Sequence, residues 1–374
     1  MAQEVNVTPL PMFIDSMSRL RYLDLSTNFF NGSIPVFIGS MTRSRYLDLS
    51  YNSFSGSIPP ELGSLKNLHF LSLNTISNCT IENIDWLFHH SHLHHLELDG
   101  ISLAKANHWV NLPDFLNNLS GCTSVTLQEL DASSSKFTGS LSDNIKKFSS
   151  LEYLSISHNQ LNGSIREKVR QLPKLETLDV SSNSLSGAIS KSIGTSNIVK
   201  VNLSNNSLKG VPSEAYMSNL SSVEQIDLSS CMLGPSFPKW IQKLKSLNYL
   251  DIANTNISDT IPVEFWTLWP SQLTHLNLSS NNITGEVTYL SSNFNPNVIS
   301  RIDLSSNNFY GSIPYVPSTL EWLDLSRNKL SGGIFFLCEV VDGQLSFLDL
   351  SDNSLTGQIP DCLWNFCWNL VNGY

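Results

Sequence analysis

The chain has 374 residues, a formal net charge of −10 and only 14% charged side chains, whereas a typical globular domain carries about 25%. This acidic balance argues against nucleic acid and anionic membranes as partners, because both attract basic surfaces. No stretch reaches the ~18 uninterrupted apolar residues of a membrane helix. Residues 1–16 lack the basic and apolar regions of a secretory signal, so we expect neither segment in this chain.

The sequence repeats itself from the start. Residues 17–35 read MSRLRYLDLSTNFFNGSIP, and residues 41–59 read MTRSRYLDLSYNSFSGSIP, which gives a period of 24. A fixed period of this length indicates stacked structural repeats rather than separate globular domains. The first position of the repeat recurs at Leu20, Ser44, Leu68, Leu93, Leu127, Leu151, Leu175, Ile198, Val223, Leu247, Leu273, Ile299, Leu320 and Leu345. We therefore expect one solenoid over residues 1–374, with about fourteen repeats and incomplete repeats at both ends.

Each unit follows the pattern LxxLxLxxNxLxGxIP, which is that of a leucine-rich repeat. In YLDLS, alternation directs Leu23 and Leu25 inward and Tyr22, Asp24 and Ser26 outward. An asparagine such as Asn28 can donate and accept hydrogen bonds in the following turn. The pattern predicts an α/β-type solenoid, a right-handed superhelix with a parallel β-sheet on its concave side, short strands or 3₁₀ turns outside, and little helix.

Residues 74–126 depart from the period. Leu93 and Leu127 are 34 positions apart, which is too long for one coil and too short for two. We interpret the segment as a coil that has been partly lost, in the gene or in its prediction. Sequencing the transcript across residues 105–130 tests this interpretation.

Five histidines fall within WLFHHSHLHHLEL, residues 86–98, and histidine is the commonest metal ligand. The repeat frame makes Leu93, Leu96 and Leu98 core residues. It places His95 on the concave face and His94 on the opposite side of the strand. His89, His90 and His92 fall on the preceding segment. We therefore favour a solvated, mildly pH-sensitive patch over a metal site, and we expect no cofactor.

The outward strand positions are the candidate binding surface. Aromatic side chains are enriched there, as at protein interfaces. We expect ligand contacts from the first outward position, at Tyr22, Tyr46, Phe70, His95, Tyr153, Tyr249, His275, Arg301, Trp322 and Phe347. The next outward position is acidic in almost every repeat, and a feature shared by all repeats does not indicate a catalytic pair. It suggests instead a surface that attracts a basic peptide or protein.

Cysteines and glycosylation sequons complete the candidate sites. Cys338 and Cys362 have a similar phase in adjacent coils, so we predict a disulfide in an oxidising compartment. Cys231 falls at the asparagine position and is expected to be structural, while Cys79, Cys122 and Cys367 have no evident partners. The N-x-S/T sequons are at Asn6, Asn31, Asn78, Asn118, Asn162, Asn202, Asn205, Asn219, Asn256, Asn277 and Asn282. Glycans on Asn202 or Asn277 would obstruct the middle of the concave face.

The GxIP ending and the 24-residue period resemble the plant-specific class of extracellular leucine-rich repeats. Residues 82–110, 112–139, 228–242 and 335–362 resemble plant receptor-like proteins, in particular the xylanase-receptor type that acts in immunity. The resemblance covers nearly the whole chain and implies an ectodomain fragment of a glycoprotein on the extracellular face of the plasma membrane. It would recognise a protein or peptide ligand in defence signalling, together with a co-receptor kinase.

Two alternatives to the receptor remain open. One is a secreted inhibitor of microbial cell-wall-degrading enzymes, which uses the same repeat. The other is a non-functional receptor fragment, because the first coil would expose core leucines without a terminal cap. Enzymatic activity is the weakest of the interpretations.

Overall fold

The computed structural model describes residues 8–11, 14, 16–76, 78–103, 110–165, 171–189, 197–210, 222–268, 273–287, 300–313, 316, 319–339 and 344–362. The chain divides into two compact units, Met1–Ile198 and Val199–Tyr374. Both are built from stacked coils, and each coil contributes one short strand to an inner parallel sheet. The predicted fold class, an α/β-type solenoid of leucine-rich repeats with a parallel sheet and little helix, is confirmed.

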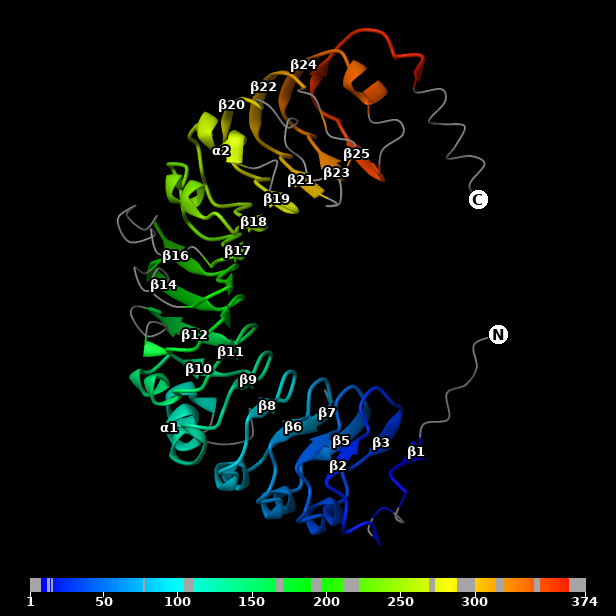
Figure 1. The fold of residues 1–374 in the computed structure, drawn as a ribbon, viewed down its shortest axis with the longest axis vertical. Helices are drawn as coiled ribbons and strands as arrows, with labels where there is room; N and C mark the ends of the chain where they lie inside the picture. The colour runs from blue at the N-terminus through cyan, green and yellow to red at the C-terminus, as the bar shows by residue number, and fades with distance from the viewer. Residues whose placement is uncertain are drawn as a thin grey trace. The chain divides into compact units, whose positions relative to one another are not determined.

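In the first unit the inner strands follow one another in chain order and pair in parallel, residue for residue, as Tyr22 pairs with Tyr46 and Tyr46 with Phe70. Figure 1 shows these strands side by side along one side of the unit. They are β2 (Tyr22–Asp24), β4 (Tyr46–Asp48), β6 (Phe70–Ser72), β8 (His95–Glu97), β9 (Glu129–Asp131), β11 (Tyr153–Ser155) and β13 (Thr177–Asp179).

The outer side of the first unit carries short strands and 3₁₀ turns. The outer strands are β1 (Thr8–Pro9), β3 (Phe30–Gly32), β5 (Ser53–Ser57), β7 (Asn78–Thr80), β10 (Thr138–Gly139), β12 (Gln160–Gly163) and β14 (Ser184–Ala188). The 3₁₀ helices are η2 (Val36–Ser40), η3 (Pro60–Ser64), η4 (Asp85–His89) and η6 (Asp143–Lys147). Leu47, Leu49, Phe54 and Ile58 fill the space between the two sides and are at most 2% exposed.

The second unit repeats this arrangement. Its inner strands are β15 (Lys200–Asn202), β17 (Gln225–Asp227), β18 (Tyr249–Asp251), β19 (His275–Asn277), β21 (Ser300–Asp303), β23 (Leu320–Asp324) and β25 (Phe347–Asp349). Its outer elements are β16 (Ser207–Lys209), η10 (Lys239–Lys243), α2 (Val263–Leu268), β20 (Thr284–Glu286), β22 (Asn308–Ser312), β24 (Lys329–Gly332), η12 (Phe335–Glu339) and β26 (Ser354–Leu355).

The 34-residue spacing between Leu93 and Leu127 corresponds to one enlarged coil, and the interpretation that a coil was partly lost stays a prediction. β8 and β9 pair directly and in register, His95 with Glu129. Between them lies α1 (Leu112–Thr123), which has a proline in its first turn and an apolar face formed by Leu112, Phe115, Leu116 and Leu119. The Phe115 ring lies 5.0 Å from that of Phe137 in the next coil. The extra residues thus form a helix that packs against the core.

The turn after each inner strand explains the acidic outward position. The Asp48 Oδ1 atom accepts a hydrogen bond from the Ser50 N–H at 2.9 Å, and Asp131 holds Ser133 in the same way. This is the backbone mimicry that favours Asp and Asn in turns. A residue with left-handed backbone follows, such as Thr27 at φ 54° and His158 at φ 53°. The recurring aspartates therefore have a structural role in the turn.

Candidate functional site

Aromatic side chains form a continuous row on the outward side of the inner strands in the first unit. The ring centroids of Tyr22 and Tyr46 are 4.1 Å apart, and those of Tyr46 and Phe70 are 4.2 Å apart, with nearly parallel planes. His95 continues the row at 5.7 Å from Phe70. In-register pairing of the strands produces this stack, because equivalent residues of adjacent coils lie opposite each other. Tyr22 at the end of the row is 58% exposed.

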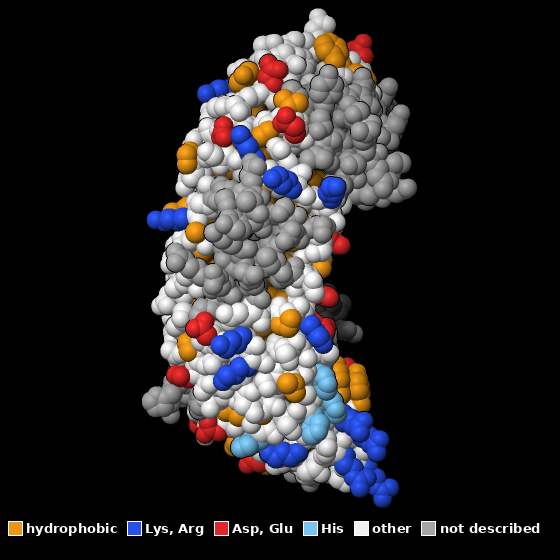
Figure 2. Space-filling model, turned by 60° about the vertical axis from the view of Figure 1, so that its left-hand side comes forward, with side chains coloured by type: hydrophobic (Ala, Val, Ile, Leu, Met, Phe, Trp, Pro, Cys, Tyr) orange, Lys and Arg blue, Asp and Glu red, His pale blue; other side chains and the backbone are white. Residues whose placement is uncertain are grey.

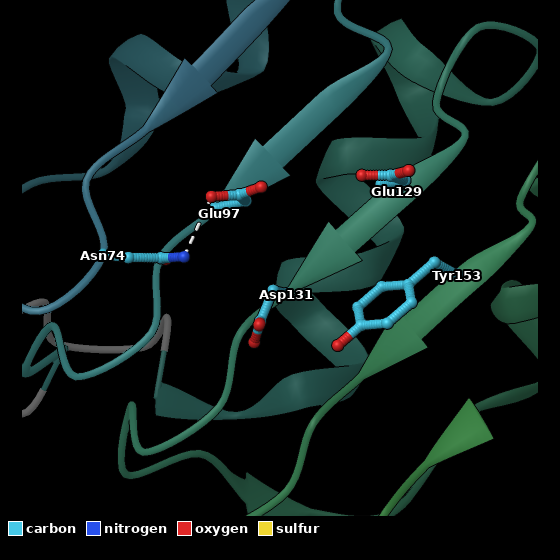
Figure 3. A pocket seen from close by; sticks show the side chains of 5 residues that line it. All are labelled: Asn74, Glu97, Glu129, Asp131 and Tyr153. Carbon is cyan, nitrogen blue, oxygen red and sulfur yellow. Dashed lines mark hydrogen bonds between the residues drawn. The ribbon is translucent and has the colours of Figure 1, made fainter. Parts of the chain in front are cut away.

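A hollow of about 270 Å³ lies at the other end of this row. It is lined by Asn74, Glu97, Glu129, Asp131 and Tyr153 (Figure 3). The Asn74 amide donates to Glu97 Oε2 at 2.9 Å, and His95 Nδ1 lies 2.9 Å from Glu129 Oε2. Figure 3 shows the Tyr153 hydroxyl directed toward Asp131. The hollow thus brings three carboxyl groups together beside one aromatic ring.

The surroundings of Glu97 and Asp131 oppose the ionisation of their carboxyl groups. Burial raises the pKa of Glu97, and the negative charges of Asp48, Asp131 and Glu129 raise it further. Burial also raises the pKa of Asp131, with contributions from Asp99 and Asp179. An ammonium or guanidinium group in the hollow would favour the charged carboxylates. The chemistry of the hollow therefore suits a basic group.

Two pairs of aromatic rings occupy the same outward position in the second unit. The rings of Tyr249 and His275 stack at 4.3 Å, and those of Trp322 and Phe347 at 3.5 Å. Between these pairs, Arg301 Nε lies 3.0 Å from Glu321 Oε2. Trp322 remains 37% exposed, so its face is available for contact.

The histidine run is arranged differently from our expectation. His90 is fully buried, so the interpretation of a solvated patch was wrong for this residue. It directly follows η4, at the position that Met41 and Leu65 occupy in the two preceding coils, which is a core position. His94 stacks on His69 of the preceding coil, with ring centroids 5.2 Å apart. Among the residues that the structure describes, no group of three or more possible ligands is arranged to hold a metal ion.

Some of the sequon asparagines already use their side chains in hydrogen bonds within the fold. Asn202 and Asn277 replace the turn aspartate, and each Oδ1 accepts the N–H and the hydroxyl of the serine two residues later. The Asn277 amide also donates to Asp251 Oδ2 at 2.9 Å, so the nitrogen that would carry a glycan is engaged. Asn6 and Asn219, the side chain of Asn78 and the cysteine Cys367 lie outside the described residues.

The cysteines Cys338 and Cys362 are bonded, with their Cα atoms 5.4 Å apart. Cys338 lies in η12, and Cys362 lies seven residues after the end of β26. Cys231 is buried and its thiol donates to the Leu203 carbonyl, in keeping with a structural role.

We expect non-reducing peptide mapping of the purified protein to recover Cys338 and Cys362 in one linked pair of peptides, because the fold brings both thiols together. Reduction should separate the pair. Recovery of both cysteines as free thiols before reduction would contradict the expected linkage.

The sequence patterns did not identify the hollow. Of the residues that line it, only Tyr153 was among the candidate site residues, and Asn74, Glu97, Glu129 and Asp131 were absent. A signal was nevertheless present: Glu97 is longer than the aspartate found at the equivalent position of other coils, such as Asp48 and Asp131. The longer side chain reaches Asn74 instead of closing the turn of its own coil.

Comparisons with known proteins agree with the repeat frame. Models of the leucine-rich repeat match residues 125–185 and 271–286, and also residues 19–41, 44–65, 246–268, 319–339 and 344–366. Receptor-like protein EIX2 of Solanum lycopersicum is 36% identical over a region covering 42% of this chain and 17% of the relative. Receptor-like protein EIX1 of the same plant is 39% identical, covering 16% of this chain and 8% of the relative. The chain therefore spans a small part of these relatives, and its resemblance to plant receptor-like proteins is confirmed.

Solved structures share the fold. The leucine-rich-repeat ectodomain of the Arabidopsis receptor kinase HAESA, solved with an N-terminally extended IDA peptide hormone, is 27% identical with a TM-score of 0.64. The match covers 95% of this chain and 61% of that one. A leucine-rich-repeat protein of Leptospira interrogans has a TM-score of 0.69 at 24% identity, covering 96% and 91% of the two chains. The fold alone is thus shared well beyond plant receptors. Within the described residues, no helix has the length and apolar character needed to span a membrane.

Proposed function

Because the chain belongs to the leucine-rich-repeat family, we propose that it recognises an extracellular protein or peptide through the outward side chains of its inner strands. This proposal rests on the aromatic row of the first unit and on the two stacked aromatic pairs of the second unit. Large aromatic side chains that remain partly exposed act as anchors at protein interfaces. The proposed contacts are Tyr22, Tyr46, Phe70, His95, Tyr153, Tyr249, His275, Arg301, Trp322 and Phe347.

The acidic hollow indicates the charge of the ligand. Burial and neighbouring negative charges raise the pKa of Glu97 and of Asp131, so a ligand with a lysine, an arginine or a free amino terminus would gain a favourable contact there. We therefore propose a ligand whose basic group enters the hollow beside Tyr153. This mode of contact is recognition, and the carboxyl groups have no catalytic role in it.

At a finer level, we propose that the chain is part of the ectodomain of a plant receptor-like protein in defence signalling, on the outer face of the plasma membrane. The two tomato relatives support a receptor over a secreted enzyme inhibitor. The bond between Cys338 and Cys362 supports an oxidising, extracellular location. A co-receptor kinase is the proposed signalling partner, as the resemblance to plant receptor-like proteins implies.

Replacing Trp322 by alanine tests the proposed surface. The wild-type chain, immobilised on a biosensor, is expected to bind a protein or peptide from fractionated microbial culture filtrate. Trp322→Ala should weaken this binding about tenfold, or by roughly 1.4 kcal/mol, because an anchoring ring is lost. Tyr310 on outer strand β22 is 50% exposed and provides the matched control, since Tyr310→Ala removes an exposed ring from the opposite side of the same unit.

Two results would count against the proposal. One is that no fraction binds the wild-type chain. The other is that Trp322→Ala and Tyr310→Ala bind the same ligand as tightly as the wild type does.

A further inference from the structure

A second row of side chains lies one position before the inner strands of the first unit. The Arg45 N–H donates to the Arg21 carbonyl, the His69 N–H to the Arg45 carbonyl and the His94 N–H to the His69 carbonyl, each at 2.8 Å. Backbone pairing thus places Arg21, Arg45, His69 and His94 on successive coils. We call these four residues the cationic row.

The same backbone position changes its charge along the unit. Gln128 donates to the His94 carbonyl at 2.7 Å, and Glu152 and Glu176 follow on the next two coils at 2.8 Å. One end is therefore permanently positive, the middle is titratable and the far end is acidic. Protonation of the two histidines would extend the positive region from two coils to four.

The imidazole rings are close enough to influence each other. His69 stacks on His94 at 5.2 Å and lies 6.0 Å from His92, whose Nδ1 is 3.3 Å from the Lys66 carbonyl. Burial lowers the pKa of His69, and the charges of His94, Arg45 and His92 lower it further. These groups come from both neighbouring coils. Without a ligand, His69 therefore resists protonation.

The surface around the cationic row carries several basic side chains. Figure 2 shows histidine side chains next to lysine and arginine side chains at one edge of the molecule. Arg21 and Arg45 are exposed, and His69 and His94 are half-buried. Such a strip has the charge to attract anions, in contrast to the acidic hollow farther along the same unit.

We propose that the cationic row binds an acidic peptide segment of a partner protein, and that protonation of His69 and His94 strengthens this binding in mildly acidic medium. This surface adjoins the aromatic row used in the proposed function and has the opposite charge to the hollow described above. It does not depend on the proposed recognition of a basic ligand.

The side chains next to the cationic row favour an acidic peptide over an acidic polysaccharide as the ligand. Each member of the row is followed directly by Tyr22, Tyr46, Phe70 or His95, whose rings form the stacked aromatic row. The charged row and the aromatic row therefore occupy adjacent positions at the start of each inner strand, whereas His94 was expected on the opposite side of the strand from His95. A peptide that alternates acidic and apolar residues can contact both. An acidic polysaccharide supplies carboxylates without apolar side chains.

The direction of the pH effect follows from linkage. A bound carboxylate next to His69 or His94 favours the imidazolium form and raises its pKa relative to the free protein. Binding then takes up protons, so affinity rises as the pH falls through the range between the free and bound pKa values. Aspartate in the ligand stays ionised well below this range, because its ordinary pKa is about 3.9.

A labelled octapeptide of alternating aspartate and leucine is a suitable probe, with binding measured by fluorescence anisotropy at pH 5.5 and 7.5. We expect the wild-type chain to bind it about tenfold more tightly at pH 5.5. The double variant His69→Gln/His94→Gln should keep the affinity at pH 7.5 and lose the gain at pH 5.5. Arg45→Gln should weaken binding at both pH values. His89, exposed at the end of η4, provides the control, and His89→Gln should behave like the wild type.

Three results would overturn the proposal. Wild-type affinity that is equal at both pH values would remove the histidine effect. A pH gain that persists in the double variant would assign it to other groups. Tighter binding of an oligogalacturonate with the same number of carboxylates would replace the peptide by a polysaccharide. None of these results bears on Trp322→Ala, so this proposal and the proposed function can fail separately.

Discussion

Asn159→Ala is expected to lower the free energy of unfolding of the first unit by about 4 kcal/mol. The Asn159 side chain makes five hydrogen bonds while only 9% exposed. Its Nδ2 donates to the carbonyls of Ala132, Ile156 and Ser157, and its Oδ1 accepts from the N–H groups of Ser135 and Phe137. Each buried backbone group left without a partner costs about 1–3 kcal/mol. Two orphaned N–H groups and three weakened carbonyls therefore account for the expected loss.

Asn28 provides a matched control for this substitution. It occupies the same position of its own repeat, but it is exposed, and its Nδ2 donates only to the Leu25 and Ser26 carbonyls. Water can satisfy both carbonyls in Asn28→Ala, so we expect a loss of about 1 kcal/mol or less. Urea unfolding gives the two free energies.

Hydrogen exchange locates the damage. The Ser135 and Phe137 amides should exchange much faster in Asn159→Ala, whereas amides of distant coils should change little. Equal losses of stability in Asn159→Ala and Asn28→Ala would contradict the proposed role of the buried hydrogen bonds.

The repeat pattern predicted most of the fold for a simple physical reason. Alternation in YLDLS sets the strand, and a constant period brings equivalent residues of successive coils into register. The pairing of Tyr22 with Tyr46 and of Tyr46 with Phe70 follows directly. The disulfide partners Cys338 and Cys362 also lie in similar phase. Such features depend on one coil and on its exact repetition.

What the sequence did not predict depends on departures from the repeat. The helix α1 forms where ten additional residues enter one coil, and the period says nothing about their conformation. The acidic hollow requires the long Glu97 side chain, Asn74 on the coil before it and Tyr153 two coils after it. The sequence also did not predict the left-handed backbone of the residue before the repeat asparagine. The identity of that residue varies from coil to coil, as Thr27 and His158 show. These features arise between coils or from the backbone, where side-chain periodicity carries little information.

His90 belongs to the same class of departures, and it has a measurable consequence. In the coils around it, the residue that ends the 3₁₀ turn is apolar: Met41, Leu65 and Phe148. His90 instead places a buried imidazole there, with Nδ1 3.1 Å from the Leu65 carbonyl and Nε2 without a hydrogen-bond partner. Burial lowers the pKa of His90 to about 4. The folded protein therefore holds this side chain neutral.

A lowered histidine pKa makes the protein sensitive to acid. In the unfolded chain the imidazole takes up a proton near pH 6.5, whereas the folded chain resists protonation down to about pH 4. Between these values the unfolded state binds more protons, so stability falls as the pH falls. A difference of this size corresponds to about 3 kcal/mol once both states are protonated. Stability from the neutral, buried form is fully present above pH 6.5.

His90→Leu should remove this acid sensitivity. The change restores the apolar residue of the neighbouring coils, and the Leu65 carbonyl still accepts the Leu68 N–H at 3.0 Å. We expect little change in the free energy of unfolding at pH 7.5 and a gain of about 2.5 kcal/mol over the wild type at pH 4.5. Urea unfolding at the two pH values measures the difference. Burial raises the pKa of Asp251 to about 6, which acts in the opposite direction, but this group is present in both proteins and cancels in the comparison.

The exposed residue His89, next to His90, provides the control for this experiment. His89→Leu changes the same residue types at a surface position of η4, so it should leave the pH dependence of stability as in the wild type. If His90→Leu lost as much stability between pH 7.5 and 4.5 as the wild type does, the acid sensitivity would have to come from other groups. If only His90→Leu resists acid, one buried imidazole in an otherwise apolar position determines how this unit responds to acid.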